Sequence, residues 1–179
     1  MVIMNVAYRR ASVDDAEAIA HVHCESWRTT YPRLIPDEII QSWADLDKRT
    51  AGWRTIVSER PQTLWLAALN DRVIGFADGG KAREPNDGCD GQLFGIYLLA
   101  TAQRQGIGQQ LVAKVLADLR AANYTSARVE VLKGNVPAIS FYERLGAKPV
   151  REAPVEMMGH SLIEIIYRWT ELPRLNFAP

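Results

Sequence analysis

The stretch LFGIYLLATAQRQGIGQQLVAKVL, Leu93–Leu116, decides the fold of this chain. Its opening run, residues 93–99, is apolar, rich in aromatic residues and of strand length. A polar segment with two glycines follows at 103–108, and apolar residues then recur at the spacing of one helix face. The stretch therefore predicts a strand, a tight turn and an amphipathic helix. The apolar face of this helix comprises Ile107, Leu111, Val112, Val115, Leu116 and Leu119.

Gly106 and Gly108 stand where this helix begins. Glycine orders at an entropic cost, so two glycines at a helix start favour close approach of the backbone to a ligand. The first N–H groups of a helix lack partners inside it, and the aligned peptide dipoles place positive potential there. The segment therefore predicts an anion site suited to phosphate. A glycine-rich helix start that binds nothing is the alternative interpretation.

Two common nucleotide-binding loops do not fit this segment. A Walker loop needs GxxxxGK followed by Ser or Thr, and no lysine follows Gly108. A dinucleotide fingerprint needs GxGxxG and an acidic residue about 20 positions further on, whereas only Gly106 and Gly108 are present here. The sequence therefore points away from both of these classes of site.

Length and composition describe one ordinary globular domain. A chain of 179 residues with 47% apolar and 23% charged residues can bury a sizeable core. The formal net charge is zero, which gives no indication of nucleic acid or a membrane surface as a partner. Cys24 and Cys89 do not form a disulfide framework, and the sequence has neither a long apolar run nor a signal-peptide pattern. We therefore expect a cytoplasmic protein.

The remaining pattern predicts an α/β (α+β) fold. Because a strand, a helix and another strand succeed one another over 93–132, we expect one parallel step with a right-handed crossover after the QRQGIG helix. The rest reads as a mixed, mostly antiparallel sheet of six to seven strands flanked by helices. One domain is expected over 1–172, with a C-terminal tail at 173–179. The candidate strands are 5–9, 63–69, 72–77, 93–99, 127–132, 148–157 and 161–169.

Helix and turn signals predict several local features. Pro36 predicts the first turn of a helix. Asn70-Asp71 and Gly159-His160 are expected to form turns between strands, and the polar segment 83–91 an exposed loop. The helix after Pro36 is expected to bury one stripe of apolar residues, Ile39, Ile40, Trp43 and Leu46.

A second motif, Asn135-x-x-Ala138-x-x-x-Tyr142-x-x-x-Gly146, follows the next predicted strand. Its first three residues stand at i, i+3 and i+7, so they share one face of a short helix. Asn135 is a suitable N-cap for that helix, and Gly146 is a suitable residue to end it. The two motifs share no residue, so the evidence from each is independent of the other.

The two motifs together resemble the GCN5-related N-acetyltransferases. One motif is Gln-x-x-Gly-x-Gly after a strand that ends in Ile-Tyr-Leu, and the other is the Asn-Ala-Tyr-Gly pattern. The resemblance covers nearly the full length of the chain and implies the acyl-CoA N-acyltransferase fold. One departure is Ala147, where the family usually has an aromatic residue, and it affects packing more than chemistry.

The resemblance implies acetyl-coenzyme A as co-substrate and no metal. In the family, the amides of the first motif hold the coenzyme's pyrophosphate, which here implies Arg104–Gln109. The strand backbone at 96–98 would pair with the pantetheine arm. Asn135 would help to place that arm, and Tyr142 would lie near the sulfur. The implied coenzyme-binding residues are Ile96, Tyr97, Leu98, Arg104, Gln105, Gly106, Ile107, Gly108, Gln109, Asn135 and Tyr142.

The resemblance also implies direct attack of an amine on the acetyl carbonyl, without an acyl-enzyme. The N–H of Leu98 would stabilise the oxyanion that forms. Tyr142 would give a proton to the departing thiolate, or it is a structural tyrosine packed on the coenzyme. Glu130 matches a strand glutamate that acts as base in some relatives, or it is an ordinary charged residue paired with lysine or arginine.

Trp27, Arg28 and Tyr31 fall where the family places its first two helices over the acceptor pocket. The phrase SWRTTYPRLIP resembles the corresponding stretch in a subgroup that contains polyamine acetyltransferases. Core packing of the aromatic residues and a solvated arginine are the alternative interpretations. His21 and His23 lie on one predicted helix about 200° apart, so they cannot share a metal ion.

Two classes of function are consistent with these features. The first is an enzyme that acetylates a primary amine of a small molecule, such as a polyamine, amino acid or antibiotic-like amine, or of a protein N-terminus. The second is a sensor or structural domain that binds acetyl-coenzyme A without turnover. The expected partner is an amine acceptor rather than nucleic acid or a membrane, and a homodimer is compatible with the sequence.

Overall fold

The structure is a computed structural model that describes residues 5–59, 63–83, 88–175 and 177. Within them, seven strands form one sheet in the order β1-β2-β3-β4-β5-β7-β6. All neighbouring strands are antiparallel except β4 and β5, which confirms the predicted mixed sheet with one parallel step. The strands are β1 (Val6–Arg10), β2 (Leu64–Leu69), β3 (Arg72–Lys81), β4 (Gly91–Leu98), β5 (Ala127–Leu132), β6 (Lys148–Met157) and β7 (His160–Trp169).

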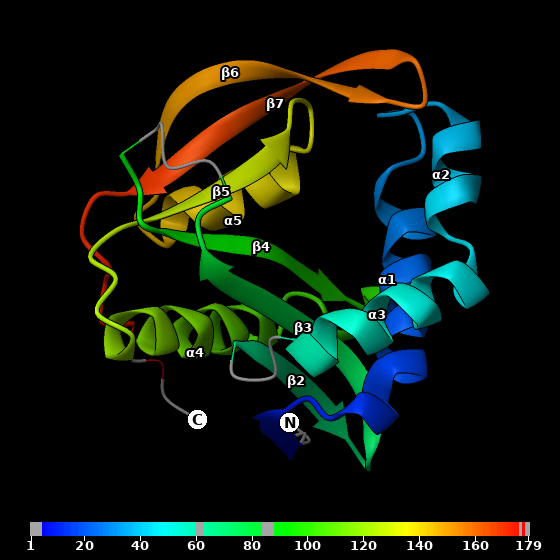
Figure 1. The fold of residues 1–179 in the computed structure, drawn as a ribbon, viewed down its shortest axis with the longest axis horizontal. Coiled ribbons are helices and arrows are strands. Elements are labelled where there is room, and N and C mark those ends of the chain that lie inside the picture. The colour runs from blue at the N-terminus through cyan, green and yellow to red at the C-terminus, as the bar shows by residue number, and fades with distance from the viewer. Residues whose placement is uncertain (1–4, 60–62, 84–87, 176, 178–179) are drawn as a thin grey trace.

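Helices cover both faces of this sheet (Figure 1). One face packs against α4 and α5, and the other packs against the helices near the N-terminus. Short 3₁₀ turns precede α1 at Val13–Asp15 and follow β4 at Ala100–Ala102. The helices are α1 (Ala16–Thr30), α2 (Asp37–Trp43), α3 (Leu46–Glu59), α4 (Ile107–Ala121) and α5 (Val136–Arg144).

The predicted crossover from β4 through α4 to β5 is confirmed. The residues predicted to form the apolar face of α4 are buried, most of them completely. Each fully buried aliphatic side chain contributes about 1.5–3 kcal/mol relative to an exposed one, so this face accounts for the firm attachment of α4 to the sheet. On β5, Val129 and Val131 point into the same core, whereas Glu130 points away from it.

β4 and β5 separate soon after they begin to pair. In the described structure their pairing is confined to Gly91 with Ala127 and Gln92 with Arg128. Beyond this point β5 rises away from β4 (Figure 1). The second half of β4, residues 94–98, is only partly buried although β4 is a central strand. We call the unpaired region between 93–98 of β4 and 129–132 of β5 the β4–β5 separation.

A β-bulge lies at the start of that unpaired part of β4. Asp78 pairs with Gly95 and Gly79 pairs with Leu93, so β4 has one residue more than β3 between these pairs, Phe94. A bulge bends a strand and increases its twist. The bulge therefore helps to turn the end of β4 away from β5.

Some local predictions need correction. α2 ends at Trp43, and Leu46 begins α3 with 39% of its surface exposed, so Leu46 does not belong to the buried stripe. The Ala44 N–H bonds to the Ile40 carbonyl and closes α2, and the new helix then turns Leu46 outward. Pro36 is the N-cap of α2 rather than a residue of its first turn.

The strand boundaries also differ from prediction near two turns. Asn70 and Asp71 form the predicted turn with positive φ angles of 50° and 63°, but β3 continues to Lys81 instead of ending at Ala77. The final turn consists of Met158 and Gly159, because both have positive φ. His160 is therefore the first residue of β7 rather than part of the turn.

Other predicted segments lie only partly within the described residues. The loop at 83–91 includes 84–87, which are outside the described residues, and its last residue, Gly91, is buried in β4. In the predicted tail, the Gln110 Nε2 donates to the Phe177 carbonyl at 3.3 Å, and Leu175 and Phe177 pack against the core under α4. The described tail residues therefore contact α4 and the core.

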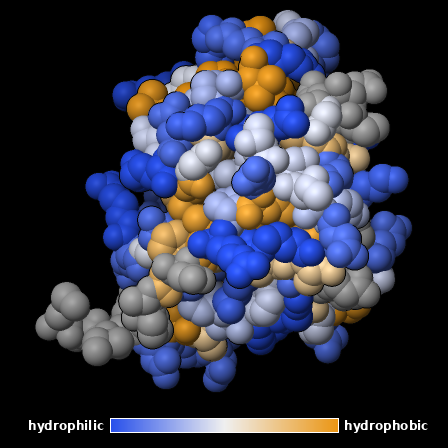
Figure 2. All heavy atoms as spheres, turned by 90° about the vertical axis from the view of Figure 1, so that its left-hand side faces the viewer, coloured by the Kyte–Doolittle hydropathy of each residue, from blue (hydrophilic) through white to orange (hydrophobic). Residues whose placement is uncertain are grey.

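No helix in the described ranges is long and apolar enough to cross a membrane. Figure 2 shows the face at the left-hand side of Figure 1, where hydrophobic residues gather only in small areas between hydrophilic ones.

His23 on α1 is buried inside an aromatic cage. Its ring lies within 6.0 Å, between centroids, of Trp27, Trp53, Phe76 and Tyr97. The Trp53 Nε1 donates to His23 Nδ1 at 3.1 Å, and His23 Nε2 is buried without a hydrogen-bond partner in the structure. Burial, and secondarily the charge of Arg49, lowers the pKa of His23 to about 3.

We therefore predict that acid destabilises the fold through His23. An unfolded histidine takes up a proton near pH 6.5, while folded His23 resists it until about pH 3. The unfolded state binds more protons between these values, so stability falls as the pH falls, by about 2–3 kcal/mol between pH 7 and pH 4.5. Urea unfolding at both pH values measures the loss.

The matched variants are His23→Gln and His21→Gln, since His21 is exposed on the same helix. His23→Gln should remove most of the loss between the two pH values, and His21→Gln should leave it unchanged. An equal loss in wild type and His23→Gln would contradict this prediction.

Candidate active site

The N-terminus of α4 lies just beyond the end of β4. Gly106, with a φ of 80°, is the N-cap of α4, and Arg104 is also left-handed with a φ of 59°. The first hydrogen bond of the helix runs from the Gln110 N–H to the Gly106 carbonyl, so the N–H groups of 107–109 precede it. We call the backbone of 104–109 the amide cradle. The exposure of 104–106 leaves this cradle accessible.

Glycine is needed at the two positions of the cradle for different physical reasons. A Cβ on Gly106 would have no atom within 4 Å, but its φ is one that residues with side chains rarely adopt. A Cβ on Gly108 would lie 3.2 Å from the Leu98 Cδ1 and 3.4 Å from a carbon of Phe141. Gly106 therefore shapes the turn, and Gly108 lets α4 approach both β4 and α5.

Hydrogen bonds fix the end of β4 relative to its surroundings. The Leu98 carbonyl accepts from Ser26 Oγ of α1 at 3.1 Å and from Gln103 Nε2 at 3.2 Å. The Leu99 N–H donates to the Ile74 carbonyl at 2.9 Å. The first glutamine of the motif thus ties the turn back to the strand, and Ser26 ties the strand to the opposite layer.

The second motif forms α5 as predicted. Asn135 is its N-cap and accepts from the Ala138 N–H at 3.3 Å, and Gly146 follows its end with a φ of 86°. Tyr142 is buried, with its ring edge toward Trp169. Burial, and then the charge that Tyr97 would carry, raises the pKa of Tyr142. The Tyr142 hydroxyl therefore stays protonated near neutral pH and can donate a hydrogen bond.

Three tyrosines and one carboxylate lie near one another. Tyr31 and Tyr97 pack against the same core cluster as Leu132, the β5 residue that pairs with Glu164. Burial raises the pKa of Tyr31 well above its usual value, and the charges that Tyr97, Tyr142 and Glu164 would carry raise it further. These side chains come from four elements: the end of α1, β4, α5 and β7. The predicted residues Tyr31, Tyr97 and Tyr142 are thus brought together, and we call them with Glu164 the tyrosine–glutamate cluster.

Sequence reasoning missed Glu164. It lies on β7 and pairs with Leu132 of β5, inside a run that is otherwise apolar, LIEIIY. A lone acidic residue in a buried strand is a signal that a sequence does carry, because an unpaired charge is costly to bury. Burial, and then the negative charge of Glu130, raises the pKa of Glu164.

Glu130 is held by neighbours at the point where β4 and β5 part. Its carboxylate forms an ion pair with Arg128, whose side chain is 3% exposed, and accepts from Gln92 Nε2 at 3.4 Å. Gln92 and Arg128 are also the last residues paired between the two strands. This geometry matches the predicted alternative for Glu130, a structural ion pair.

The other predicted acceptor residues lie on the opposite face of the sheet from α4. Trp27 is buried and stacks on Trp43 with centroids 4.8 Å apart. Arg28 donates to Glu25 at 2.7 Å and to the Ala44 carbonyl at 2.6 Å. Trp27 therefore packs α1 against α2, and Arg28 ties α1 to the end of α2.

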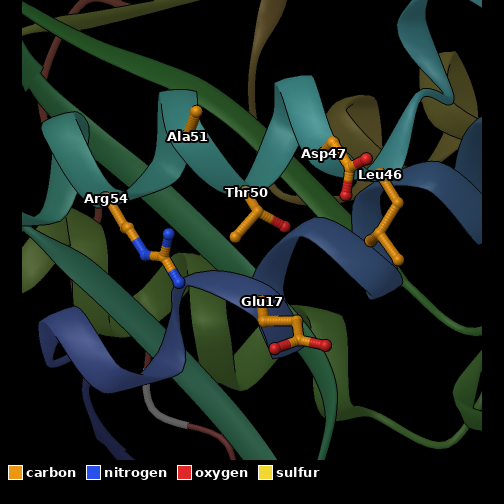
Figure 3. A pocket seen from close by; sticks show the side chains of 6 residues that line it. All are labelled: Glu17, Leu46, Asp47, Thr50, Ala51 and Arg54. Atoms are coloured by element: carbon orange, nitrogen blue, oxygen red, sulfur yellow. The ribbon is translucent and has the colours of Figure 1, made fainter.

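One surface hollow lies away from these residues. It has a volume of about 310 Å³ and lies between α1 and α3 (Figure 3). None of the predicted site residues lines it, so it is a separate feature of the surface. Among the described residues, no group of three His, Cys, Asp or Glu side chains is arranged to hold a metal ion. The lining residues are Glu17, Leu46, Asp47, Thr50, Ala51 and Arg54.

Comparison with known proteins gives matches of sequence and of structure. The sequence model of the acetyltransferase (GNAT) family matches residues 16–147. The N-acetyltransferase YuaI of Bacillus subtilis, itself uncharacterised, is 34% identical over 96% of both chains. The spermidine N(1)-acetyltransferase of Thermoplasma acidophilum is 26% identical over 81% of this chain and 89% of that protein.

A solved structure shares the fold. The PaiA N-acetyltransferase of Thermoplasma acidophilum, determined in complex with coenzyme A, superposes with a TM-score of 0.71. The match covers 93% of this chain and 100% of that one at 22% identity. The order of strands and the single parallel step are therefore those of the acyl-CoA N-acyltransferase fold.

The Glu130 ion pair predicts a cost in stability. Glu130→Gln leaves the buried Arg128 guanidinium without its carboxylate, so unfolding should need about 1–3 kcal/mol less free energy. Glu152→Gln is the matched control, because the Glu152 pair with Lys133 is about half exposed and its loss should cost under about 1 kcal/mol. Urea unfolding measures both, and equal effects would argue against a structural pair at Glu130.

Proposed function

Since the chain belongs to the acetyltransferase (GNAT) family, it is an acetyl-transferring enzyme, and we propose that it moves the acetyl group of acetyl-coenzyme A directly to a primary amine. The acceptor is a small-molecule amine or a protein N-terminus. The observation that carries this proposal is the β4–β5 separation, with the amide cradle at its end and the tyrosine–glutamate cluster beside it.

The chain's own residues fit the coenzyme in two places. The N–H groups at the start of α4 have no acceptor inside the helix, and the helix dipole favours negative charge there, which suits a diphosphate. On the side toward β5, the backbone of 93–98 has no strand partner and can take an extended pantetheine arm like an added strand. Asn135, which caps α5, lies in the motif that the family uses to place that arm.

The proposed chemistry uses the end of β4 and the side chain of Tyr142. Acetyl-coenzyme A supplies a thioester whose carbonyl is open to attack by an amine. The Leu98 N–H stabilises the oxyanion that forms on the acetyl carbonyl. Its position is fixed because the Leu98 carbonyl accepts hydrogen bonds from Ser26 and Gln103. The protonated Tyr142 hydroxyl donates to the departing sulfur.

Acceptor identity is the finer part of the proposal. The relative named as a spermidine N(1)-acetyltransferase supports a polyamine as one acceptor to test. The second candidate function, an acetyl-coenzyme A sensor without turnover, requires only the amide cradle. The cluster of buried hydroxyls with Glu164 favours the enzyme, because it offers proton donors and an acceptor that transfer to an amine requires.

An acceptor screen tests the proposed function. Purified protein with acetyl-coenzyme A and a panel of polyamines, amino acids, aminoglycosides and peptides should release free thiol with at least one amine. Binding of acetyl-coenzyme A by calorimetry without thiol release across the whole panel would support the sensor. Absence of both binding and release would refute both candidate functions.

Gly106→Val tests the amide cradle. A branched residue at a φ of 80° distorts the turn, so acetyl-coenzyme A should bind at least about tenfold more weakly in calorimetry. Gly159→Val is the matched control, since Gly159 also has a φ of 80° and no atom within 4 Å of an added Cβ, but lies in the β6–β7 turn.

The two glycine variants should lose similar stability, about 1–2 kcal/mol for a left-handed residue with a side chain. Only Gly106→Val should lose coenzyme affinity. Unchanged affinity in a folded Gly106→Val protein would refute the cradle.

Tyr142→Phe tests the proton donor. Turnover should fall by about 100-fold, because the departing thiolate loses its donor, while the dissociation constant of acetyl-coenzyme A changes little. Tyr167→Phe is the control, since it also removes a tyrosine hydroxyl. That hydroxyl donates to Glu143 at 3.0 Å and does not belong to the tyrosine–glutamate cluster. Steady-state rates with the amine found in the screen measure both, and unaltered turnover in Tyr142→Phe would exclude this tyrosine as the acid.

A further inference from the structure

Glu164 differs from the other carboxylates near the β4–β5 separation. It is partly buried on β7, and no hydrogen bond or ion pair to its carboxylate is present among the described residues. Glu130, by comparison, is held by Arg128 and Gln92. Burying a carboxylate without a partner costs free energy, which a cationic group placed beside it would recover.

The groups that face Glu164 come from several elements. From β5, Glu130 raises its pKa and Arg128 lowers it, and burial has the largest effect, an increase. From the end of α1 and from β4, Tyr31 and Tyr97 lie close enough for the charge of Glu164 to raise the pKa of each. Its neighbour across β6 is Ala153, which carries no charge. Glu164 is therefore near neutral hydroxyls and near one ion pair, Arg128 with Glu130.

Tyr31 links Glu164 to the reacting groups. Tyr31 packs against the same core cluster as Leu132, the strand partner of Glu164, and its pKa responds to the charges of both Glu164 and Tyr142. Glu164 is the partly buried carboxylate of this cluster, and it has no ion pair within the described structure. The position suits a group that receives a proton from the amine.

We propose that Glu164 binds the ammonium group of a protonated alkylamine acceptor and takes its proton, and that this residue makes the enzyme selective for cationic amines. The inference rests on the proposed function. Resemblance alone selected Glu130 for this role, but the contacts of Glu130 leave it as a member of a structural ion pair.

The proton balance of this step is complete. An alkylammonium, with an ordinary pKa of about 10.4, gives one proton to the Glu164 carboxylate and becomes a neutral amine. The amine nitrogen then bonds to the acetyl carbon while the carbon–sulfur bond breaks. The nitrogen loses its second proton as the thiolate gains one from Tyr142, and the Tyr142 oxygen is reprotonated from the nitrogen. Glu164 finally releases its proton to water.

The test compares three glutamine variants, Glu164→Gln, Glu130→Gln and Glu152→Gln. Thiol release from acetyl-coenzyme A with spermidine as acceptor is followed from pH 6 to pH 10. At pH 7 Glu164→Gln should lower kcat/KM by at least about 100-fold. The loss should shrink toward pH 10, because the amine then loses its proton to water without help. Glu152→Gln, an exposed residue of β6, should stay within about twofold of wild type.

The outcomes separate the inference from the proposed function. A loss in Glu164→Gln that is the same at every pH would indicate a structural role and overturn the inference. A pH-dependent loss in Glu130→Gln instead would assign the base to Glu130 and overturn it as well. Calorimetry with acetyl-coenzyme A should give equal affinities for all four proteins. If wild type fails to bind it, the proposed function itself fails.

If wild type binds acetyl-coenzyme A but releases no thiol with spermidine, a measurement of spermidine binding tests the inference instead. Spermidine is then titrated into each protein loaded with coenzyme A. An affinity at least about tenfold lower in Glu164→Gln than in wild type supports the ammonium site. Equal affinities, or no binding by wild type, overturn it.

Discussion

β4 and β5 are parallel neighbours that share only two residue pairs, and the rest of the structure depends on this early separation. Backbone groups inside a protein need hydrogen-bond partners. The separation leaves one edge of a central strand without a strand partner, and a ligand with an extended amide-containing arm can supply what is missing. The bulge at Phe94 and the Arg128–Glu130 pair lie where the two strands diverge, and the bonds to the Leu98 carbonyl lie at the end of β4. These features hold the edge open in one conformation.

The acetyl-donor half of the proposed site consists mainly of backbone, and the amine-acceptor half consists of side chains. In this proposal backbone would hold the donor, because the amide cradle and the edge of β4 need only the right φ angles and a helix start. Side chains from α1, β4, α5 and β7 form the acceptor half, and they meet only because the sheet brings these elements together. A backbone site tolerates many side chains, whereas a site made of converging side chains depends on each of them. This explains why the coenzyme half can be identified from a motif shared by a whole family, whereas the acceptor cannot.

The same division sets how much the sequence could predict. Local signals were sufficient for the crossover around α4, the Asn135 cap and the Asn70-Asp71 turn, because each depends on neighbours in the chain. Leu46 was assigned to a buried stripe because its spacing fits a helix that in fact stops at Trp43. Glu164 was overlooked because its role depends on Leu132 as a strand partner and on Tyr31 and Tyr97, which are more than sixty residues away. Glu130 was selected by resemblance, and only the contacts with Arg128 and Gln92 revealed its structural partners.

Gly108 has a consequence for how such a chain can change over evolutionary time. A single added carbon there would press on Leu98 of β4 and on Phe141 of α5, so three elements meet at one hydrogen atom. A larger residue at position 108 would therefore require smaller side chains at positions 98 and 141. The helices that carry the two motifs, although far apart in sequence, therefore pack against each other at Gly108, and we expect substitutions at these positions to occur together.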